Sequence, residues 1–189
     1  MAITDLDIAN MAFVKLGLEP VTSLSESTDQ VTAFNKIYPV QRRRTIIAGK
    51  WRFARKRVAL VVNVTAPVYD WSAAFDLPTD SLLVLSTDDD GLPWIIEGSQ
   101  LLCSRDSVSI TYIRDVTDPD DFTHAFTEAL SELIASDLAP ALTGKAALKE
   151  VHYKLFLHKV QEARTLEAQQ GTPPTLEMSD LEDARFGTV

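Results

Sequence analysis

Apolar side chains recur every three or four positions near the start of the chain, which is the period of an amphipathic helix. Residues 4–17 place Leu6, Ala9, Phe13 and Leu16 on one face, and Gly17 then ends the pattern. Thr4 is followed three residues later by an acidic residue, Asp7, which predicts a capping box at the helix start.

A second helix is predicted over residues 27–49, beginning at Ser27. Its apolar face consists of Val31, Phe34 and Tyr38. We expect Pro39 to bend this helix, because proline lacks a backbone donor and its ring clashes with the preceding turn.

The middle of the chain changes to short apolar runs rich in β-branched residues. These runs are residues 58–64, 82–85, 94–96, 101–103 and 108–113. Turn-forming stretches at 88–91, 97–99 and 104–107 separate the last four. The pattern predicts an antiparallel meander.

Helical periodicity returns after Asp118 and Pro119, which are typical of a helix cap and a first helical position. The longest apolar stripe of the chain follows, made of Phe122, Ala125, Phe126, Ala129, Leu130, Leu133, Ile134, Leu138, Ala141 and Leu142. Gly144 should end this helix.

One more long helix is expected from Lys145 to about Gln169, with Leu148, Val151, Leu155 and Leu166 facing inward. The order of these elements predicts an α+β fold that is mainly α. About four helices, from 1–57 and 118–170, would form a bundle, and 58–117 would be a small inserted antiparallel β-sheet. Residues 171–189 have little apolar content, and we expect an extended C-terminal tail that orders on a partner.

Charge is distributed unevenly in this acidic chain, which has 18 Lys and Arg against 27 Asp and Glu. Residues 42–57 contain no acidic side chain and hold eight of the basic ones: Arg42, Arg43, Arg44, Lys50, Arg52, Arg55, Lys56 and Arg57. The stretch has three interpretations: a solvated helix face, pairing with an acidic surface of a neighbouring subunit, or contact with DNA phosphates. The overall acidity argues against a dedicated DNA-binding protein.

Neighbours within the basic stretch lead to two further expectations. Arg42, Arg43 and Arg44 are consecutive, so they should fan around a helix and not all meet one partner. Trp51 and Phe53 alternate with basic residues, and we expect them to pin the helix end to the β part.

Catalytic and metal-binding patterns are weak. His124, His152 and His158 lack the spacing of metal ligands, and no glycine-rich phosphate loop is present. Cys103, the single cysteine, is expected to be a core residue. Residues 86–97 partly match a calcium loop, but their flanks read as strands, which favours a solvated hairpin turn. We therefore expect no enzymatic activity, no catalytic residue, no metal and no cofactor.

No run of apolar residues approaches the ~20 needed to span a membrane, and the first residues lack a signal-peptide pattern. We therefore expect no membrane association.

Several short motifs occur in a fixed order along the chain. They include a first helix ending in Leu16-Gly17, the run Tyr38-Pro39, the run 51–54 (Trp-Arg-Phe-Ala), the stretch 75–80 (Phe-Asp-Leu-Pro-Thr-Asp) and the run 110–113 (Ile-Thr-Tyr-Ile). In this order, over residues 3–170, the chain resembles the tail tubular protein A family of phages, the head-to-tail adaptor proteins.

The resemblance implies a twelve-membered homo-oligomeric ring at the head–tail junction of a virion, assembled in the host cytoplasm. The ring would bind the portal protein on one side and a tail nozzle or other tail protein on the other, and double-stranded DNA would pass through it. It also implies portal docking by the tail, where the candidates are Thr172, Pro173, Pro174, Leu176, Met178, Leu181 and Phe186.

Three alternatives stay open beside the adaptor role. They are a nucleic-acid-binding protein that uses the basic stretch, a peptidoglycan-hydrolysing tail component, and a stopper-type head-completion protein.

Overall fold

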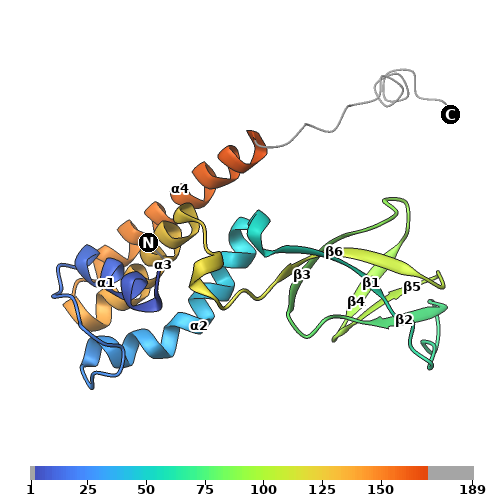
Figure 1. The fold of residues 1–189 in the computed structure, drawn as a ribbon, viewed down its shortest axis with the longest axis horizontal. Coiled ribbons are helices and arrows are strands. Elements are labelled where there is room, and N and C mark those ends of the chain that lie inside the picture. The colour runs from blue at the N-terminus through green and yellow to red at the C-terminus, as the bar shows by residue number, and fades with distance from the viewer. Residues whose placement is uncertain (1–2, 170–189) are drawn as a thin grey trace.

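The computed structural model describes residues 3–169, which form an α+β fold. Its helices are α1 (Asp5–Lys15), α2 (Asp29–Gly49), α3 (His124–Thr143) and α4 (Ala146–Gln169). Figure 1 shows that the helices lie together at one end of an elongated molecule and that the strands form the other end. Among the described residues, no helix is long and apolar enough to cross a membrane.

The strands form two small antiparallel sheets, and, except for β4 and β5, neighbours in a sheet are not neighbours in sequence. One sheet has the order β1-β6-β3, with β1 at Arg55–Leu60, β6 at Val108–Arg114 and β3 at Ser81–Thr87. The other has the order β2-β5-β4, with β2 at Ala73–Asp76, β5 at Gln100–Cys103 and β4 at Trp94–Glu97. The predicted meander is therefore wrong, although β4 and β5 do form a hairpin around Gly98.

Two features of the β part differ from the sequence prediction. The pattern missed β2, whose residues Ala73, Ala74 and Phe75 are buried without alternation. The acidic turn 88–91 is not a hairpin turn, because it connects β3 to β4, which belong to different sheets. Asp89 stabilises this turn by accepting a hydrogen bond from the backbone N–H of Gly91 at 2.9 Å.

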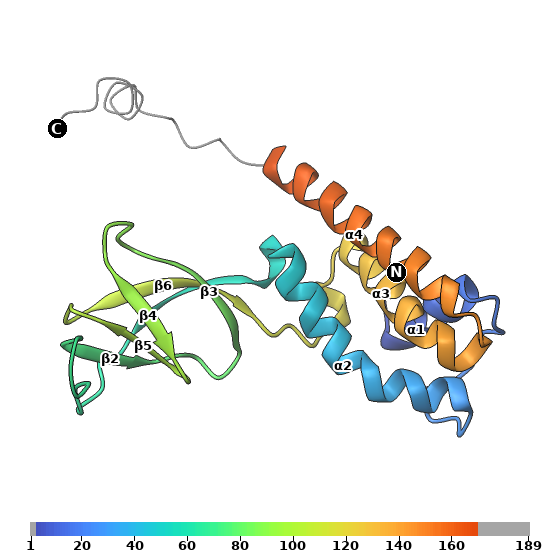
Figure 2. The ribbon, with the colours of Figure 1, turned by 180° about the vertical axis from the view of Figure 1, so that it is seen from behind.

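The helix starts follow their capping residues. The capping box at Thr4 is confirmed, since its hydroxyl accepts a bond from the Asp7 N–H and the Asp7 carboxylate accepts one from the Thr4 N–H. Thr28 and not Ser27 caps α2, which therefore begins at Asp29. Pro39 lies inside α2 without ending it, and Figure 2 shows the helix axis changing direction between its two halves.

The helix predicted after Asp118 begins later than expected. Asp118 caps only a short 3₁₀ turn, Pro119–Asp121, and Phe122 then returns to extended backbone. The hydroxyl of Thr123 accepts a hydrogen bond from the Phe126 N–H, so this residue caps α3. Phe122 is thus not part of the helix, but its ring still packs in the core, 4.6 Å from the Phe126 ring centre.

Helix α3 is the centre of the helical core. It packs against α1, α2 and α4, and its residues Leu130, Leu133 and Ile134 are completely buried. Gly144 ends α3 in the left-handed conformation, as the sequence predicted.

Of the inward face predicted for α4, Leu148 does pack against the helical core, but the prediction is wrong for the other three residues. Val151, Leu155 and Leu166 are 51%, 41% and 58% exposed. The buried residues are instead His152, Phe156, Val160 and Ala163, which recur at spacings of four and three. Helix α4 carries two apolar stripes, and only contact with α3 decides which one is covered.

This assignment predicts a large difference between two adjacent positions. Phe156→Ala should lower the free energy of unfolding by about 3–5 kcal/mol, because it empties a fully buried site. Leu155→Ala removes a partly exposed side chain and should cost less than about 1 kcal/mol. Urea unfolding, monitored by circular dichroism, measures the free energy of unfolding of both variants. Equal decreases would contradict the finding that Phe156, and not Leu155, is buried.

Candidate interaction surface

The structure divides the basic stretch 42–57 into residues bound within the chain and residues exposed to solvent. Arg42 is buried, and its Nη2 donates to Oδ1 of Asp115 at 3.0 Å. Arg43 is exposed, and its Nε donates to Oδ2 of the same carboxylate at 2.7 Å. As expected, the three consecutive arginines do not all meet one partner, since Arg42 and Arg43 converge on the two oxygens of Asp115 whereas Arg44 points to Tyr153.

Asp115 lies where the chain returns from the strands to the helices. Its backbone N–H donates to the carbonyl of Asp80 at 2.7 Å. The Asp80 carboxylate in turn accepts a bond from the Tyr112 hydroxyl at 2.9 Å and lies 3.7 Å from the Lys56 Nζ. These contacts tie α2 to β1, β6 and the start of β3 at one junction.

Two ionisable groups of the junction, Asp115 and Tyr112, have shifted pKa values. Burial raises the pKa of Asp115, but the hydrogen bonds and charges of Arg43 and Arg42 outweigh it, and the net pKa lies below the ordinary value of 3.8. Burial, followed by the hydrogen bond to Asp80, raises the pKa of Tyr112 to about 12. Both shifts favour the hydrogen-bonded state of the junction at neutral pH.

Trp51 and Phe53 do not attach the helix end to the β part as expected. The Trp51 ring meets the Phe126 ring edge-on at 5.4 Å, and Phe53 lies 5.2 Å from the same ring. The Trp51 Nε1 donates to the Thr45 carbonyl, which closes the end of α2. The aromatic residues therefore anchor the basic stretch to α3.

The exposed part of the stretch forms a basic surface, defined here as Lys50, Arg55 and Arg57. Lys50 ends α2 in the left-handed conformation, and its carbonyl accepts a hydrogen bond from the Arg55 Nε at 3.1 Å. Arg57 follows Arg55 on the same face of β1. Within residues 3–169, the side chains of Lys50 and Arg57 contact no acidic side chain.

The remaining basic side chains of the stretch have other neighbours. Arg44 lies over the Tyr153 ring of α4 at 5.5 Å, an arrangement typical of a cation–π contact. The backbone N–H of Arg52 donates to Oε1 of Glu167 at 3.2 Å. Because β1 is an edge strand, the charges at 55–57 also discourage unspecific pairing with other strands.

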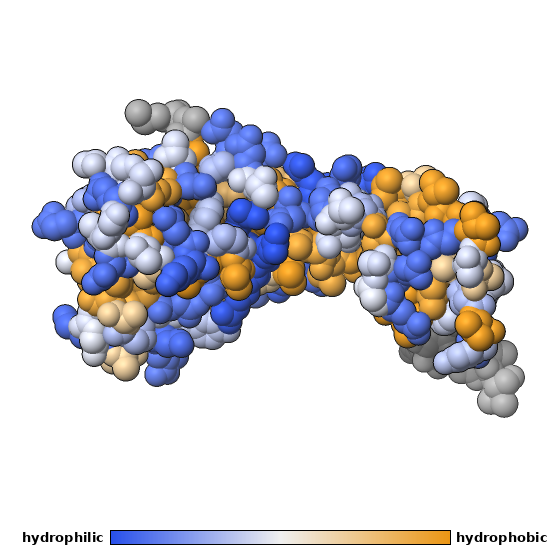
Figure 3. All heavy atoms as spheres, turned by 90° about the horizontal axis from the view of Figure 1, so that it is seen from below, coloured by the Kyte–Doolittle hydropathy of each residue, from blue (hydrophilic) through white to orange (hydrophobic). Residues whose placement is uncertain are grey.

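Two apolar surfaces are exposed in addition to the basic surface. The first is the α4 stripe, defined as Val151, Leu155 and Leu166. The second is in the loop between β1 and β2, where Val61, Val64, Val68 and Tyr69 are at least 76% exposed. Figure 3 shows hydrophobic patches over the end of the molecule formed by the strands. Contiguous apolar patches of this kind mark protein contacts.

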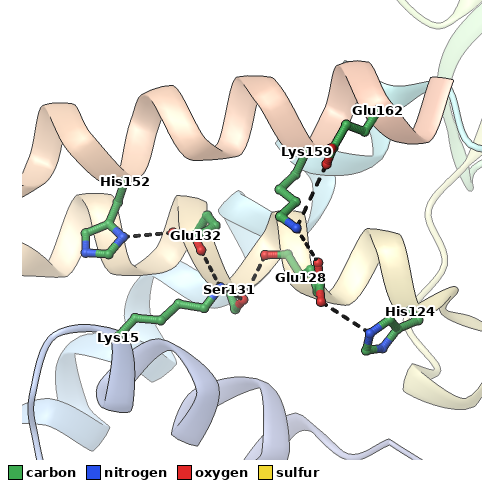
Figure 4. Close-up of polar contacts among 8 residues, drawn as sticks. All are labelled: Lys15, His124, Glu128, Ser131, Glu132, His152, Lys159 and Glu162. Carbon is green, nitrogen blue, oxygen red and sulfur yellow. Dashed lines mark hydrogen bonds and ion pairs between the residues drawn. The ribbon is translucent and has the colours of Figure 1, made fainter. Parts of the chain in front are cut away.

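Sequence reasoning missed a buried polar network that joins three helices. Lys15 of α1 donates to Oε1 of Glu132 at 2.6 Å and to Ser131 at 2.8 Å, and Glu132 Oε2 lies 2.8 Å from His152 Nδ1 (Figure 4). The Glu132 and His152 side chains are each 9% exposed. In the sequence, the signal for this network was Glu132, a charged residue within the segment that carries the longest apolar stripe.

A second polar row lies farther along the same helices. Lys159 of α4 donates to Glu128 of α3 at 2.9 Å, and His124 lies 3.2 Å from Glu128 (Figure 4). The Lys159 hydrogen bond lowers the pKa of Glu128 despite opposition from burial. His152 is thus a structural partner of Glu132, whereas His124 and His158 lie on the surface beside Glu128 and Glu162.

Among the described residues, no three His, Cys, Asp or Glu side chains lie close enough together to hold a metal ion. Cys103 is buried, as predicted, and burial raises the pKa of its thiol. A surface hollow of about 590 Å³ lies beside the loop 63–71, with Glu97 and Gln100 on its rim.

The portal-docking candidates Thr172, Pro173, Pro174, Leu176, Met178, Leu181 and Phe186 lie outside the described residues. Comparison with known proteins assigns no family, because no family model and no curated protein matches the chain.

Asp115→Asn should destabilise the protein by about 3 kcal/mol at neutral pH, because it leaves the buried Arg42 without its charged partner. Since the folded-state pKa of Asp115 is lowered, its contribution is complete above the unfolded pKa and is lost as the pH falls through the folded value. The difference between wild type and variant should therefore shrink below about pH 4.

The matched control is Asp90→Asn, an exposed acidic residue that should change stability by less than about 0.5 kcal/mol. Thermal unfolding at pH 7 and pH 3 measures both variants. A pH-independent effect of Asp115→Asn would contradict a charged Asp115 at the junction.

Proposed function

We propose that this chain is a structural protein of a tailed phage particle, a head-to-tail adaptor. Copies would form a ring between the portal and the tail, and double-stranded DNA would pass through its channel. On this proposal the chain is a virion component of the head–tail junction, assembled in the host cytoplasm, with no enzymatic role. The ordered motifs over residues 3–170 are the sequence basis of the proposal.

The arrangement of the elements supports this proposal. Helices from both ends of the described chain share one core, and the strands from the middle project away from it (Figure 1). We regard the helical part, 1–57 with 118–170, as a bundle of four helices and 58–117 as an insertion. A projecting insertion gives each copy a second region that can contact a neighbour or a tail protein.

The uncovered α4 stripe is the observation that carries the proposal. The helical core contains none of Val151, Leu155 and Leu166, yet these side chains are exposed on one face of α4, where Lys159 and Glu162 separate Leu166 from the other two. A ring built by one repeated contact requires two different, complementary surfaces on each copy. We assign the α4 stripe to the contact with a second copy of this chain.

The basic surface provides a second contact, and its positive charge is opposite to the net charge of the rest of the chain. Outside residues 42–57 the chain carries 10 basic and 27 acidic side chains. If Lys50, Arg55 and Arg57 face an acidic surface of the neighbouring copy, the channel wall keeps mainly acidic side chains, which repel DNA phosphates. Arginines of residues 42–57 lining the channel would contradict this orientation.

The experiment is electron cryo-microscopy of the protein mixed with the portal ring of its own phage. Twelve-fold density added below the portal would support the adaptor role, and residues 172–189 should then contact portal subunits. An intact portal without added density, in the presence of folded protein, would remove the adaptor proposal.

Leu155→Asp should prevent the ring from forming on the portal without unfolding the chain, because this side chain is exposed in the single copy. Burial of a leucine contributes about 1.5–3 kcal/mol, so occupancy should fall at least about tenfold. Val40→Asp, at a position 62% exposed on α2, is the matched control and should bind like wild type. Equal occupancy of both variants would exclude the α4 stripe as a subunit contact.

Nucleic-acid binding is the second candidate function, and the exposed Lys50 and Arg57 favour it. Binding through phosphates releases counterions, so DNA affinity would fall steeply as salt rises. A strong salt-dependent affinity that is lost in Lys50→Glu/Arg57→Glu, together with no binding to the portal, would favour this function over the adaptor.

A further inference from the structure

The described part of the chain ends beside the basic surface. Glu167 accepts a hydrogen bond from the Arg52 backbone N–H at 3.2 Å, and Arg164 donates to the Ala48 carbonyl near the end of α2. The last turns of α4 therefore lie against the end of α2, where the basic surface begins. Gln169, two residues beyond Glu167, is the last described residue and lies in the part of α4 that contacts the end of α2.

The sequence that follows is acidic. Residues 170–176 are uncharged, and residues 177–183 then contain Glu177, Asp180, Glu182 and Asp183 without a basic residue. This is the opposite charge to the basic surface, whose residues Lys50 and Arg57 have no acidic neighbour within residues 3–169. The uncharged link supplies the length needed to bring the two charged groups together.

We propose that the acidic segment 177–183 binds the basic surface of its own chain, formed by Lys50, Arg55 and Arg57. Helix α4 ends at Gln169, eight residues before Glu177, and an extended chain of that length reaches about 26 Å. The basic surface begins within a few residues of Arg52, which Glu167 already contacts. Chain length therefore permits the contact with slack to spare.

Attachment to the same chain favours the contact over one with a free partner. Because a link of only a few residues joins the acidic segment to the same chain, we expect an effective concentration in the millimolar range at the basic surface. The basic side chains are exposed, so the contact is screened by salt and stays reversible. The segment can thus be displaced by a partner that binds it more tightly.

The consequence for assembly rests on the proposed function. While the acidic segment covers Lys50, Arg55 and Arg57, an acidic surface of a neighbouring copy is excluded from them. Docking of residues 172–189 on the portal would withdraw the segment and expose the basic surface. Ring formation would then follow portal binding and would be suppressed in free solution.

Disulfide trapping in the full chain tests the contact directly. Ala59→Cys lies on the β1 face that carries Arg55 and Arg57, and Ser179→Cys lies inside the acidic segment, so neither substitution removes a charge. Thr32→Cys with Ser179→Cys is the control pair, because Thr32 is exposed on α2 about 27 Å along the helix from Lys50. Cys103 is buried and is the same in every variant.

We expect the Ala59→Cys pair to form an intrachain disulfide at least about tenfold faster than the control pair at low salt. The advantage should vanish when the Debye length shrinks from about 30 Å at 0.01 M to about 3 Å at 1 M. It should also vanish when Glu177, Asp180, Glu182 and Asp183 are all replaced by their amides. Circular dichroism confirms that each variant is folded.

Equal rates for the two pairs, a salt-independent advantage, or disulfide-linked dimers in place of monomers would each overturn the proposal. Portal binding of the same variants is measured separately. Fast intrachain trapping without portal binding would contradict only the adaptor function. Equal trapping rates together with a complete ring on the portal would contradict only the contact between the acidic segment and the basic surface.

Discussion

The carboxylate of Asp115 holds the helical and β parts of the molecule in one orientation. The chain leaves the helices after Ala54 and returns near Val116, so two crossings connect the parts. Arg42 and Arg43 reach from α2 to the two oxygens of Asp115 beside the second crossing. Because Arg42 and Arg43 are bound at this junction, the basic side chains that remain available to partners are those farther along the stretch.

Helix α3 gives the helical part a fixed internal arrangement. Its apolar residues fill the core, but Glu132 interrupts them and must find partners, since a buried charge without hydrogen bonds is costly. Lys15 from α1 and His152 from α4 provide these partners. Apolar packing alone tolerates small rotations of a helix, whereas this network requires the three helices to meet at defined positions. A fixed α4 is what keeps its second apolar stripe pointing away from the core.

The exposed surfaces follow from these two constraints. The contact with α3 uses one face of α4 and leaves Val151, Leu155 and Leu166 uncovered. The junction uses Arg42 and Arg43 and leaves Lys50, Arg55 and Arg57 in solvent. The helix ends bring these surfaces together, because Glu167 of α4 meets Arg52. The proposed ring contact at the α4 stripe and the proposed intrachain contact at the basic surface therefore lie in neighbouring regions of one molecule.

The sequence by itself determined the local elements whose signals lie within a few residues. The capping box at Thr4, the stop at Gly144, the helical parts and the positions of five of the six described strands, all except β2, could be found from periodicity and caps. It could not decide the strand order, the covered face of α4 or the partner of Arg42, and it placed Trp51 against the wrong part. Each of these depends on contacts between residues far apart in the chain, such as Arg42 with Asp115 and Trp51 with Phe126. A helix with two apolar stripes looks the same in sequence whichever stripe is buried, and only the competition for space against α3 selects one.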